Sequence, residues 1–239
     1  MWAPFIVKCF GDQSFAAVLL WLIERKLMQI LVVSGSHRAS GKSGLVGEHV
    51  ERVTRRECED CNVKYMSLVD YSDLLYHYHE DRGSKIDERI EQQKRNLLTE
   101  LYSSDGIVVI SPEWGGMMTP LITNMMLLTA RGSAGGFPLA HKPGLAIGVS
   151  EGSGGCYPIS MLRGFASKNS QVCWLPFHVV IQNVDEFLAH EWSPGNENRF
   201  SVVQSRLLSS VKALRIYAMQ LKPVRENLLT LSELHPYGQ

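Results

Sequence analysis

Residues 30–43 read ILVVSGSHRASGKS, an apolar run rich in β-branched residues that passes directly into a loop of serines and glycines. A helical pattern of apolar residues follows, from Leu45 to about Cys58. This order of strand, small-residue loop and helix suits an anion, because the N–H groups at a helix start lack backbone partners and the helix dipole favours negative charge. Arg38 adds a guanidinium that can donate two parallel hydrogen bonds to phosphate oxygens. The stretch therefore predicts a phosphate site.

The rest of the chain repeats the alternation of strands and helices. Further strands are predicted at 63–69, 107–110, 145–149 and 172–181, and further helices at 85–103, 120–130, 158–168 and 200–221. Five strands that alternate with helices predict an α/β fold of three layers, in which helices cover both faces of a parallel sheet.

The predicted strand order brings three loops together. In the flavodoxin-like order 2-1-3-4-5, the loops after strands one, three and four are neighbours at the carboxyl edge of the sheet, where ligands bind in such folds. These loops, 34–43, 111–117 and 150–156, are also the ones rich in small residues. One ligand can therefore touch all three.

Length and charge restrict the classes of function. The chain has 239 residues and a formal net charge of zero, which favours neither nucleic acid nor an anionic membrane as a partner. We expect one domain at 28–222, an extension at 1–27 outside it, and a loosely attached tail at 223–239. The apolar run at 16–23 is too short to span a bilayer. Five cysteines without a clear secretion signal indicate reduced thiols and a cytoplasmic location.

The ending Gly41-Lys42-Ser43 raises an alternative, the GxxxxGK[ST] loop of proteins that bind nucleoside triphosphates. In that motif the first glycine lets the backbone wrap around the phosphates, and Ser36 occupies its position here. A Mg²⁺ ion would also need an aspartate after an apolar strand, whereas Ser-Pro-Glu follows the run 107–110. A P-loop-type nucleotide-binding protein is therefore the weaker interpretation, and a single terminal phosphate, as in FMN, is favoured.

The three loops together resemble those of a known family. They read GSHR at 35–38 with Ser43 beyond, SPEWGG at 111–116, and SEGSGG at 150–155 after Lys142-Pro143. In this order and spacing the chain resembles the NADPH-dependent FMN reductase family, flavodoxin-like flavoproteins that include quinone, chromate and azo-dye reductases. The resemblance covers roughly residues 28 to 185 and implies a bound FMN with NADPH or NADH as electron donor.

The resemblance also implies a role for each loop. The first would hold the FMN phosphate, the second would line one edge of the flavin ring, largely through backbone groups, and the third would pass the ring on its other side. The residues concerned are Ser36, Arg38 and Ser43 in the first loop, Pro112, Glu113, Trp114 and Gly115 in the second, and Glu151, Gly152 and Ser153 in the third. No catalytic acid or base is expected, because the flavin performs the chemistry, and no metal is expected, because no matching ligand cluster accompanies the cysteines.

The chain departs from the family pattern at several positions. The second loop commonly reads Pro-Glu-Tyr-Asn-Gly, whereas Trp114 replaces the tyrosine and Gly115 the asparagine here. Gly41 stands where many relatives have a serine, so Ser43 or Ser40 must serve the phosphate. The lost amide contact predicts a lower affinity for FMN.

We therefore expect an FMN-dependent NAD(P)H oxidoreductase that passes electrons to a quinone, free flavin or another small acceptor. The resemblance also implies a homodimer or homotetramer, in which a neighbour shelters the flavin ring. The alternative from another class is a flavodoxin-like electron carrier without a substrate of its own. Such carriers are usually acidic, and the balanced charge of this chain argues against one.

Overall fold

Five parallel strands form the centre of the structure, a computed structural model that describes residues 27–76, 88–190 and 198–236. The strands are β1 (Met28–Ser34), β2 (Cys61–Ser67), β3 (Gly106–Pro112), β4 (Pro143–Val149) and β5 (Cys173–Ile181). They pair in the order β2-β1-β3-β4-β5, all parallel. The fold class and the strand order predicted from the sequence are confirmed. Residues 1–26 of the expected extension 1–27 lie outside the described residues.

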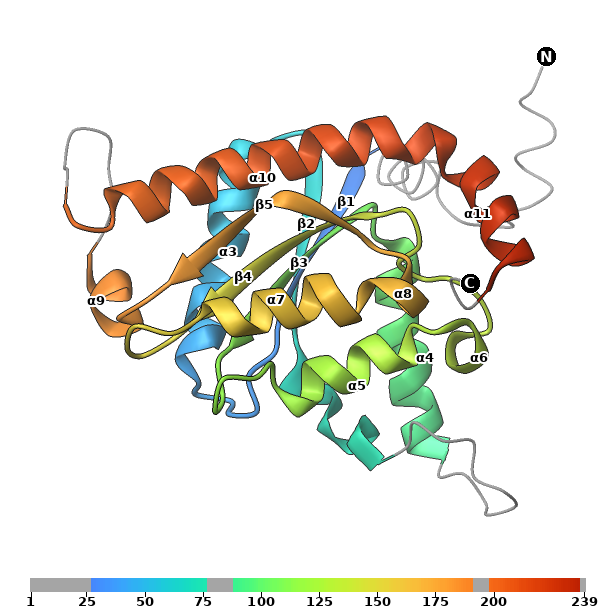
Figure 1. The fold of residues 1–239 in the computed structure, drawn as a ribbon, viewed down its shortest axis with the longest axis horizontal. Helices are drawn as coiled ribbons and strands as arrows, with labels where there is room; N and C mark the ends of the chain where they lie inside the picture. Colours follow the sequence, from blue (N-terminus) through green and yellow to red (C-terminus); the bar gives the residue numbers. More distant parts are fainter. Residues whose placement is uncertain (1–26, 77–87, 191–197, 237–239) are drawn as a thin grey trace, which may run out of the picture.

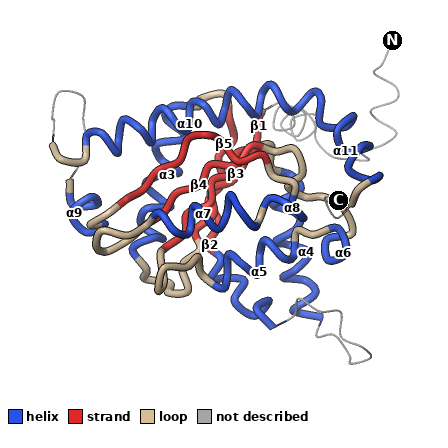
Figure 2. Tube along the Cα trace, in the orientation of Figure 1, coloured by secondary structure: helices blue, strands red, loops and turns tan. Residues whose placement is uncertain are grey.

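Helices cover both faces of this sheet (Figures 1 and 2). Helices α3 (Lys42–Glu57) and α10 (Ser201–Leu221) pack on one face, and α4 (Glu88–Ser103), α5 (Pro120–Leu128) and α7 (Cys156–Phe165) pack on the other. Shorter elements connect them: α6 (Arg131–Ala134), α8 (Ser167–Ser170), α9 (Val184–Ala189) and the 3₁₀ helices η1 (Leu68–Tyr76) and η2 (Lys222–Val224). Helix α11 (Arg225–Leu234) follows η2.

Strand β1 shows why this sequence forms a sheet that is covered on both sides. Ile30 and Val32 belong to the core with α3 and α10, whereas Leu31 and Val33 belong to the core with α4 and α5. Because successive side chains of a strand point to opposite faces, a continuous apolar run is what a doubly covered strand requires. Burying each such side chain contributes about 1.5–3 kcal/mol. The same reasoning applies to the apolar run of β3.

The strand register brings the three predicted loops to one edge of the sheet. Ser34 at the end of β1 is opposite Ile110, and Pro112 at the end of β3 is opposite Val149 at the end of β4. Backbone hydrogen bonds continue the register into the loops, since the Glu113 N–H donates to the Val149 carbonyl over 2.9 Å. The loops therefore begin at fixed positions beside one another.

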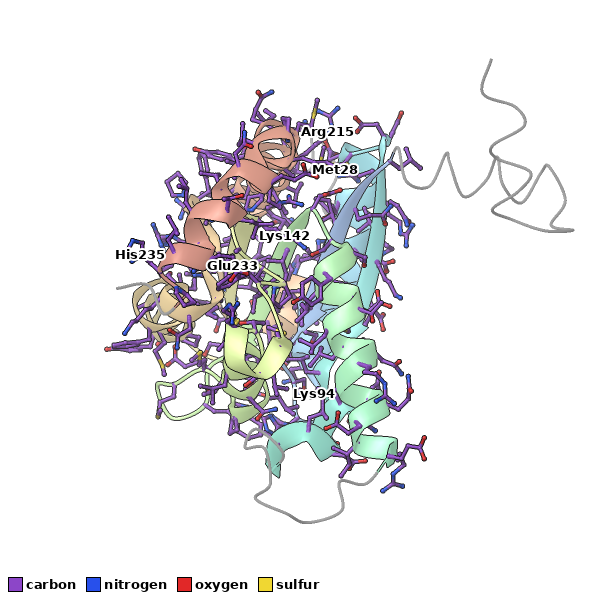
Figure 3. All side chains as sticks on the ribbon, turned by 90° about the vertical axis from the view of Figure 1, so that its right-hand side faces the viewer. Met28, Lys94, Lys142, Arg215, Glu233 and His235 are labelled. Atoms are coloured by element: carbon purple, nitrogen blue, oxygen red, sulfur yellow. The ribbon has the colours of Figure 1, made fainter. Side chains whose placement is uncertain are left out.

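The C-terminal segment differs from the expectation. The sequence predicts a loosely attached tail at 223–239, whereas residues 225–234 form α11, in which Figure 3 labels Glu233. Polar contacts bind this helix to the rest of the domain. Arg225 pairs with the buried Asp105 at 3.2 Å, and Glu233 pairs with Arg131 at 2.7 Å. These contacts were not foreseen, because the sequence interpretation relied on apolar periodicity and ion pairs do not carry that signal.

Candidate functional site

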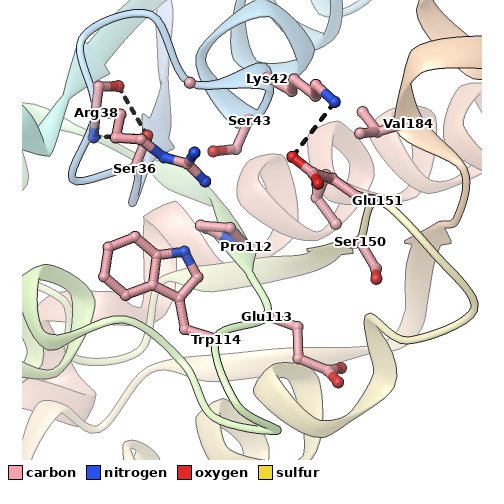
Figure 4. A pocket seen from close by; sticks show the side chains of 12 residues that line it. Ser36, Arg38, Lys42, Ser43, Pro112, Glu113, Trp114, Ser150, Glu151 and Val184 are labelled. Carbon is pink, nitrogen blue, oxygen red and sulfur yellow. Dashed lines mark hydrogen bonds and ion pairs between the residues drawn. The ribbon is translucent and has the colours of Figure 1, made fainter.

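A cleft of about 220 Å³ lies where the three loops meet (Figure 4). Seven of the ten predicted site residues line it, namely Ser36, Arg38, Ser43, Pro112, Glu113, Trp114 and Glu151. The other three, Gly115, Gly152 and Ser153, belong to the same loops but are not among the lining residues. The structure thus brings most of the predicted set together around one cleft.

The first loop is closed by its own hydrogen bonds. The Ser36 hydroxyl donates to the Arg38 carbonyl over 2.8 Å and accepts from the Arg38 N–H over 3.1 Å. The Gly41 N–H donates to the same carbonyl. A Cβ atom at Gly41 would lie 2.2 Å from the Ser36 Oγ, so a serine cannot stand at position 41 unless Ser36 moves. In this geometry Ser36 shapes the loop, and its single proton is already donated.

The start of α3 supplies the donors that a phosphate needs. Gly41 is the N-cap residue and, as a glycine, offers no side-chain acceptor to the first-turn N–H groups, although its carbonyl accepts from the Gly44 N–H over 2.8 Å. The first turn contains no acidic residue. Ser43 is buried at the cleft wall, and Arg38 lines the same cleft. This donor set of backbone N–H groups, a hydroxyl and a guanidinium fits a phosphomonoester.

The Glu113 side chain joins the second loop to the third. Its Oε2 atom accepts a hydrogen bond from the Gly155 N–H at 2.5 Å. Gly155 is the buried N-cap residue of α7, so the carboxylate caps that helix from the neighbouring loop. The sequence interpretation assigned Glu113 a role through its backbone and missed this contact. The signal that could have revealed it is a carboxylate in one loop opposite a glycine-rich helix start in the next.

Trp114 stands over the opposite part of the cleft from the start of α3. Its ring contacts that of His37, with centroids 4.8 Å apart, and 39% of the residue is exposed. The His37 Nδ1 atom is buried without a hydrogen-bond partner, and burial lowers the pKa of this imidazole. Trp114 also lines a second, more open hollow of about 490 Å³ beside α5. An aromatic surface therefore separates the two hollows.

The second loop contains a tight turn in which glycine suits position 115. Trp114 and Met117 exchange two backbone hydrogen bonds of 3.0 Å across the turn. The two residues between them, Gly115 and Gly116, have φ values of +56° and +79°. A two-residue turn of this kind suits Asn-Gly or Gly-Gly, because both positions need positive φ. The family asparagine and the glycine of this chain therefore suit the same backbone.

The third loop turns partly away from the cleft. The Gly152 carbonyl accepts from the Asn183 N–H at 3.1 Å, and the Ser153 carbonyl accepts from the Gln182 side chain. Both partners follow β5, which explains why Gly152 and Ser153 do not line the cleft.

Glu151 instead faces Lys42, a residue that the sequence interpretation did not assign to the flavin site. The Lys42 Nζ atom lies 3.3 Å from Glu151 Oε1 and 2.5 Å from Asp185 Oδ2. The GKS ending drew attention to this lysine, but only in the P-loop alternative.

Two further properties concern the described ranges alone. Within 27–76, 88–190 and 198–236, no group of three or more His, Cys, Asp or Glu side chains is placed to hold a metal ion. Over the same residues, no helix combines the length and the apolar character that crossing a membrane requires.

Comparisons with solved structures agree with this fold. An NADH:FMN oxidoreductase, EMOB, matches with a TM-score of 0.58 and 16% identity over 79% of this chain and 89% of its own. An oxidoreductase from Corynebacterium diphtheriae matches with a TM-score of 0.58 and 12% identity over 82% and 98%. FerB, a flavoenzyme NAD(P)H:(acceptor) oxidoreductase from Paracoccus denitrificans, matches with a TM-score of 0.53 and 16% identity over 82% and 99%. At these identities the likeness shows the fold alone.

The sequence comparisons identify the family. No curated protein matches the chain significantly. The family model described as NADPH-dependent FMN reductase matches residues 28–184, more than half of the sequence. The match contains the three loops that form the cleft. The chain therefore belongs to the NADPH-dependent FMN reductase family.

Proposed function

We propose that this protein is an FMN-dependent NAD(P)H oxidoreductase that passes electrons from NADPH or NADH to a quinone, free flavin or another small acceptor. One observation carries the proposal: a phosphate-type donor set and an exposed indole line the same cleft, at the carboxyl edge of a parallel sheet. Membership of the family supports the choice of FMN. FMN, when bound, supplies the hydride and electron chemistry, so the chain needs no catalytic acid or base of its own.

In this proposal the first loop binds the phosphate. The Arg38 guanidinium and the N–H groups at the start of α3 neutralise the dianion, and the Ser43 hydroxyl donates to it. Ser36 holds the Arg38 backbone in position through its two hydrogen bonds.

The second and third loops bind the flavin ring between them. Pro112 and Trp114 provide one edge, with Gly115 continuing the turn beside them. Glu151 passes the other side, with Gly152 and Ser153 continuing that loop outside the cleft lining. Glu113 keeps the two loops together through the Gly155 N–H. A flat ring needs this spacing to be fixed, because displacement of either loop opens the ring to water.

We further propose a homodimer or homotetramer in the cytoplasm. The hollow beside Trp114 exposes Met117 at 56% and Leu127 at 42%, and a second copy over these side chains would shelter both them and the ring. Light scattering of the purified protein tests the oligomeric state, and a monomer at micromolar concentration contradicts this part.

Reconstitution with FMN tests the central claim. The purified protein should show a flavin absorbance spectrum, and Arg38→Ala should weaken FMN binding about tenfold, the effect of losing one charge-assisted hydrogen bond. Arg55→Ala is the matched control, because Arg55 lies on α3 and pairs with Glu51 instead. Steady-state oxidation of NADPH and NADH with added quinone then measures turnover.

Three outcomes contradict the proposal in different ways. Failure to bind FMN rejects the flavin site, and binding of Mg-ATP in its place favours the P-loop alternative. Binding of FMN without turnover with any acceptor favours an electron carrier.

A further inference from the structure

Lys42 is paired twice at the mouth of the cleft. Its ammonium contacts Asp185 at 2.5 Å and Glu151 at 3.3 Å, and Figure 4 shows the contact with Glu151 across the upper part of the cleft. The three residues come from different segments: Lys42 opens α3, Glu151 follows β4, and Asp185 lies in α9 after β5. One side chain therefore connects three segments at the carboxyl edge of the sheet.

This pairing leaves the cleft short of positive charge. Arg38 and Lys42 are the cations that line it, while Glu113 and Glu151 line it as anions and Asp185 contacts Lys42 from α9. Two carboxylates thus neutralise one ammonium, and Arg38 alone faces an incoming dianion. A phosphate site usually presents an excess of positive charge. A phosphate ligand must therefore change the pairing of Lys42 with its carboxylates.

The ion pairs that Lys42 forms with Glu151 and Asp185 are exposed, so Lys42 can exchange these partners readily. The Glu151 and Asp185 side chains are 65% and 68% exposed, and Lys42 is 36% exposed. Exposed ion pairs contribute little to stability, because water and salt screen them. A phosphate dianion held at the α3 N-terminus carries more charge than either carboxylate. Lys42 adjoins Ser43, which lines the cleft at that terminus.

We propose that Lys42 exchanges its two carboxylates for the phosphate of the ligand, and that Glu151 and Asp185 act as competing anions that set the affinity for phosphate. The proposal rests on the proposed function, because it takes the ligand to be a flavin phosphate. It gives Lys42 of the GKS ending a role in binding the ligand, which the flavin site described above did not include. It also means that binding of the phosphate breaks the ion pairs that join the third loop and α9 to Lys42.

Comparing FMN with riboflavin isolates the phosphate. Riboflavin has the same ring and ribityl chain without the phosphate, so a residue that acts on the phosphate changes only the FMN affinity. We expect Lys42→Met to weaken FMN about tenfold and to leave riboflavin unchanged. Asp185→Asn, which removes the carboxylate nearer to the Lys42 ammonium and lies outside the cleft lining, should tighten FMN about threefold or more, again without an effect on riboflavin. In the Lys42→Met background this tightening should shrink, because the Asp185 carboxylate then has no ammonium to compete for.

The matched controls come from a similar ion pair away from the cleft. Lys64 and Glu100 are 2.5 Å apart and join β2 to α4. Neither residue lines the cleft. Lys64→Met and Glu100→Gln should therefore leave both flavin affinities unchanged. Quenching of flavin fluorescence on titration with protein gives all of these constants.

The results separate this inference from the proposed function. Equal weakening of FMN and riboflavin binding by Lys42→Met, no weakening at all, or weaker FMN binding in Asp185→Asn overturns the role of Lys42. If wild-type protein binds neither flavin, the proposed function fails, and inorganic phosphate decides the inference. Phosphate should then raise the melting temperature of the wild type more than that of Lys42→Met. No rise, or an equal rise in both proteins, overturns it.

Discussion

The Glu113 carboxylate should hold two loops of the site together, and its removal tests how much the fold and the site depend on that contact. The hydrogen bond to Gly155 is short, 2.5 Å, and its acceptor is charged. Bonds of this kind contribute about 1.5–3 kcal/mol. Gly155 is buried, so Glu113→Ala leaves an N–H group without water or a partner. The same contact also caps α7, which adds up to about 1 kcal/mol through the helix dipole.

We therefore expect Glu113→Ala to lower the free energy of unfolding by about 2–3 kcal/mol. Glu113→Gln keeps a carbonyl acceptor and should lose only about 1 kcal/mol. Urea unfolding followed by circular dichroism measures both values. FMN titration should also weaken in the alanine variant, because the second and third loops are no longer joined.

Glu48→Ala is a suitable control, because Glu48 is an exposed residue of α3. Its effect should stay within about 0.5 kcal/mol. A loss of stability for Glu113→Ala no greater than that of the control would refute the reasoning, and so would equal losses for the alanine and glutamine variants.

Two further predictions concern steric fit and pH. Gly41→Ser should weaken FMN binding and leave riboflavin binding unchanged, because the new Cβ atom would lie only 2.2 Å from the Ser36 Oγ atom and displace it. Equal FMN affinities of the wild type and the variant contradict this. Burial lowers the pKa of Lys142 to about 7, against 10.5 in the unfolded chain, so the unfolded state binds more protons between these values. Unfolding free energy should then rise with pH from about 7.5 to 9.5, at roughly 1.4 kcal/mol per pH unit. This rise in unfolding free energy should vanish in Lys142→Met. If it persists in that variant, another titrating group causes it.

The elements of the fold were predictable because they depend on local periodicity. The apolar runs of β1 and β3 indicate strands that are covered on both faces, and their alternation with helices restricts the strand order. The positions of small residues at strand ends then locate the cleft. Seven of the ten site residues line it for this reason.

Long-range polar contacts were not predictable in the same way. The pairs Glu113–Gly155 and Lys42–Asp185 join residues 42 and 143 positions apart. Such contacts depend on which way each side chain points once the strands are ordered, and periodicity carries no information about that. The contacts of α11 were not predictable for the same reason, because Arg225 reaches Asp105 across 120 positions.

The glycine turn in the second loop has a consequence for how this family diversifies. No atom lies within 4 Å of where a Cβ would stand at Gly115 or Gly116, and both backbones are left-handed. Asparagine tolerates that conformation better than other residues with a side chain. The backbone path of the loop and the chemistry of its tip can therefore change independently over evolution. One amino-acid substitution at position 115 can add or remove an amide at the loop tip without a change in the backbone path.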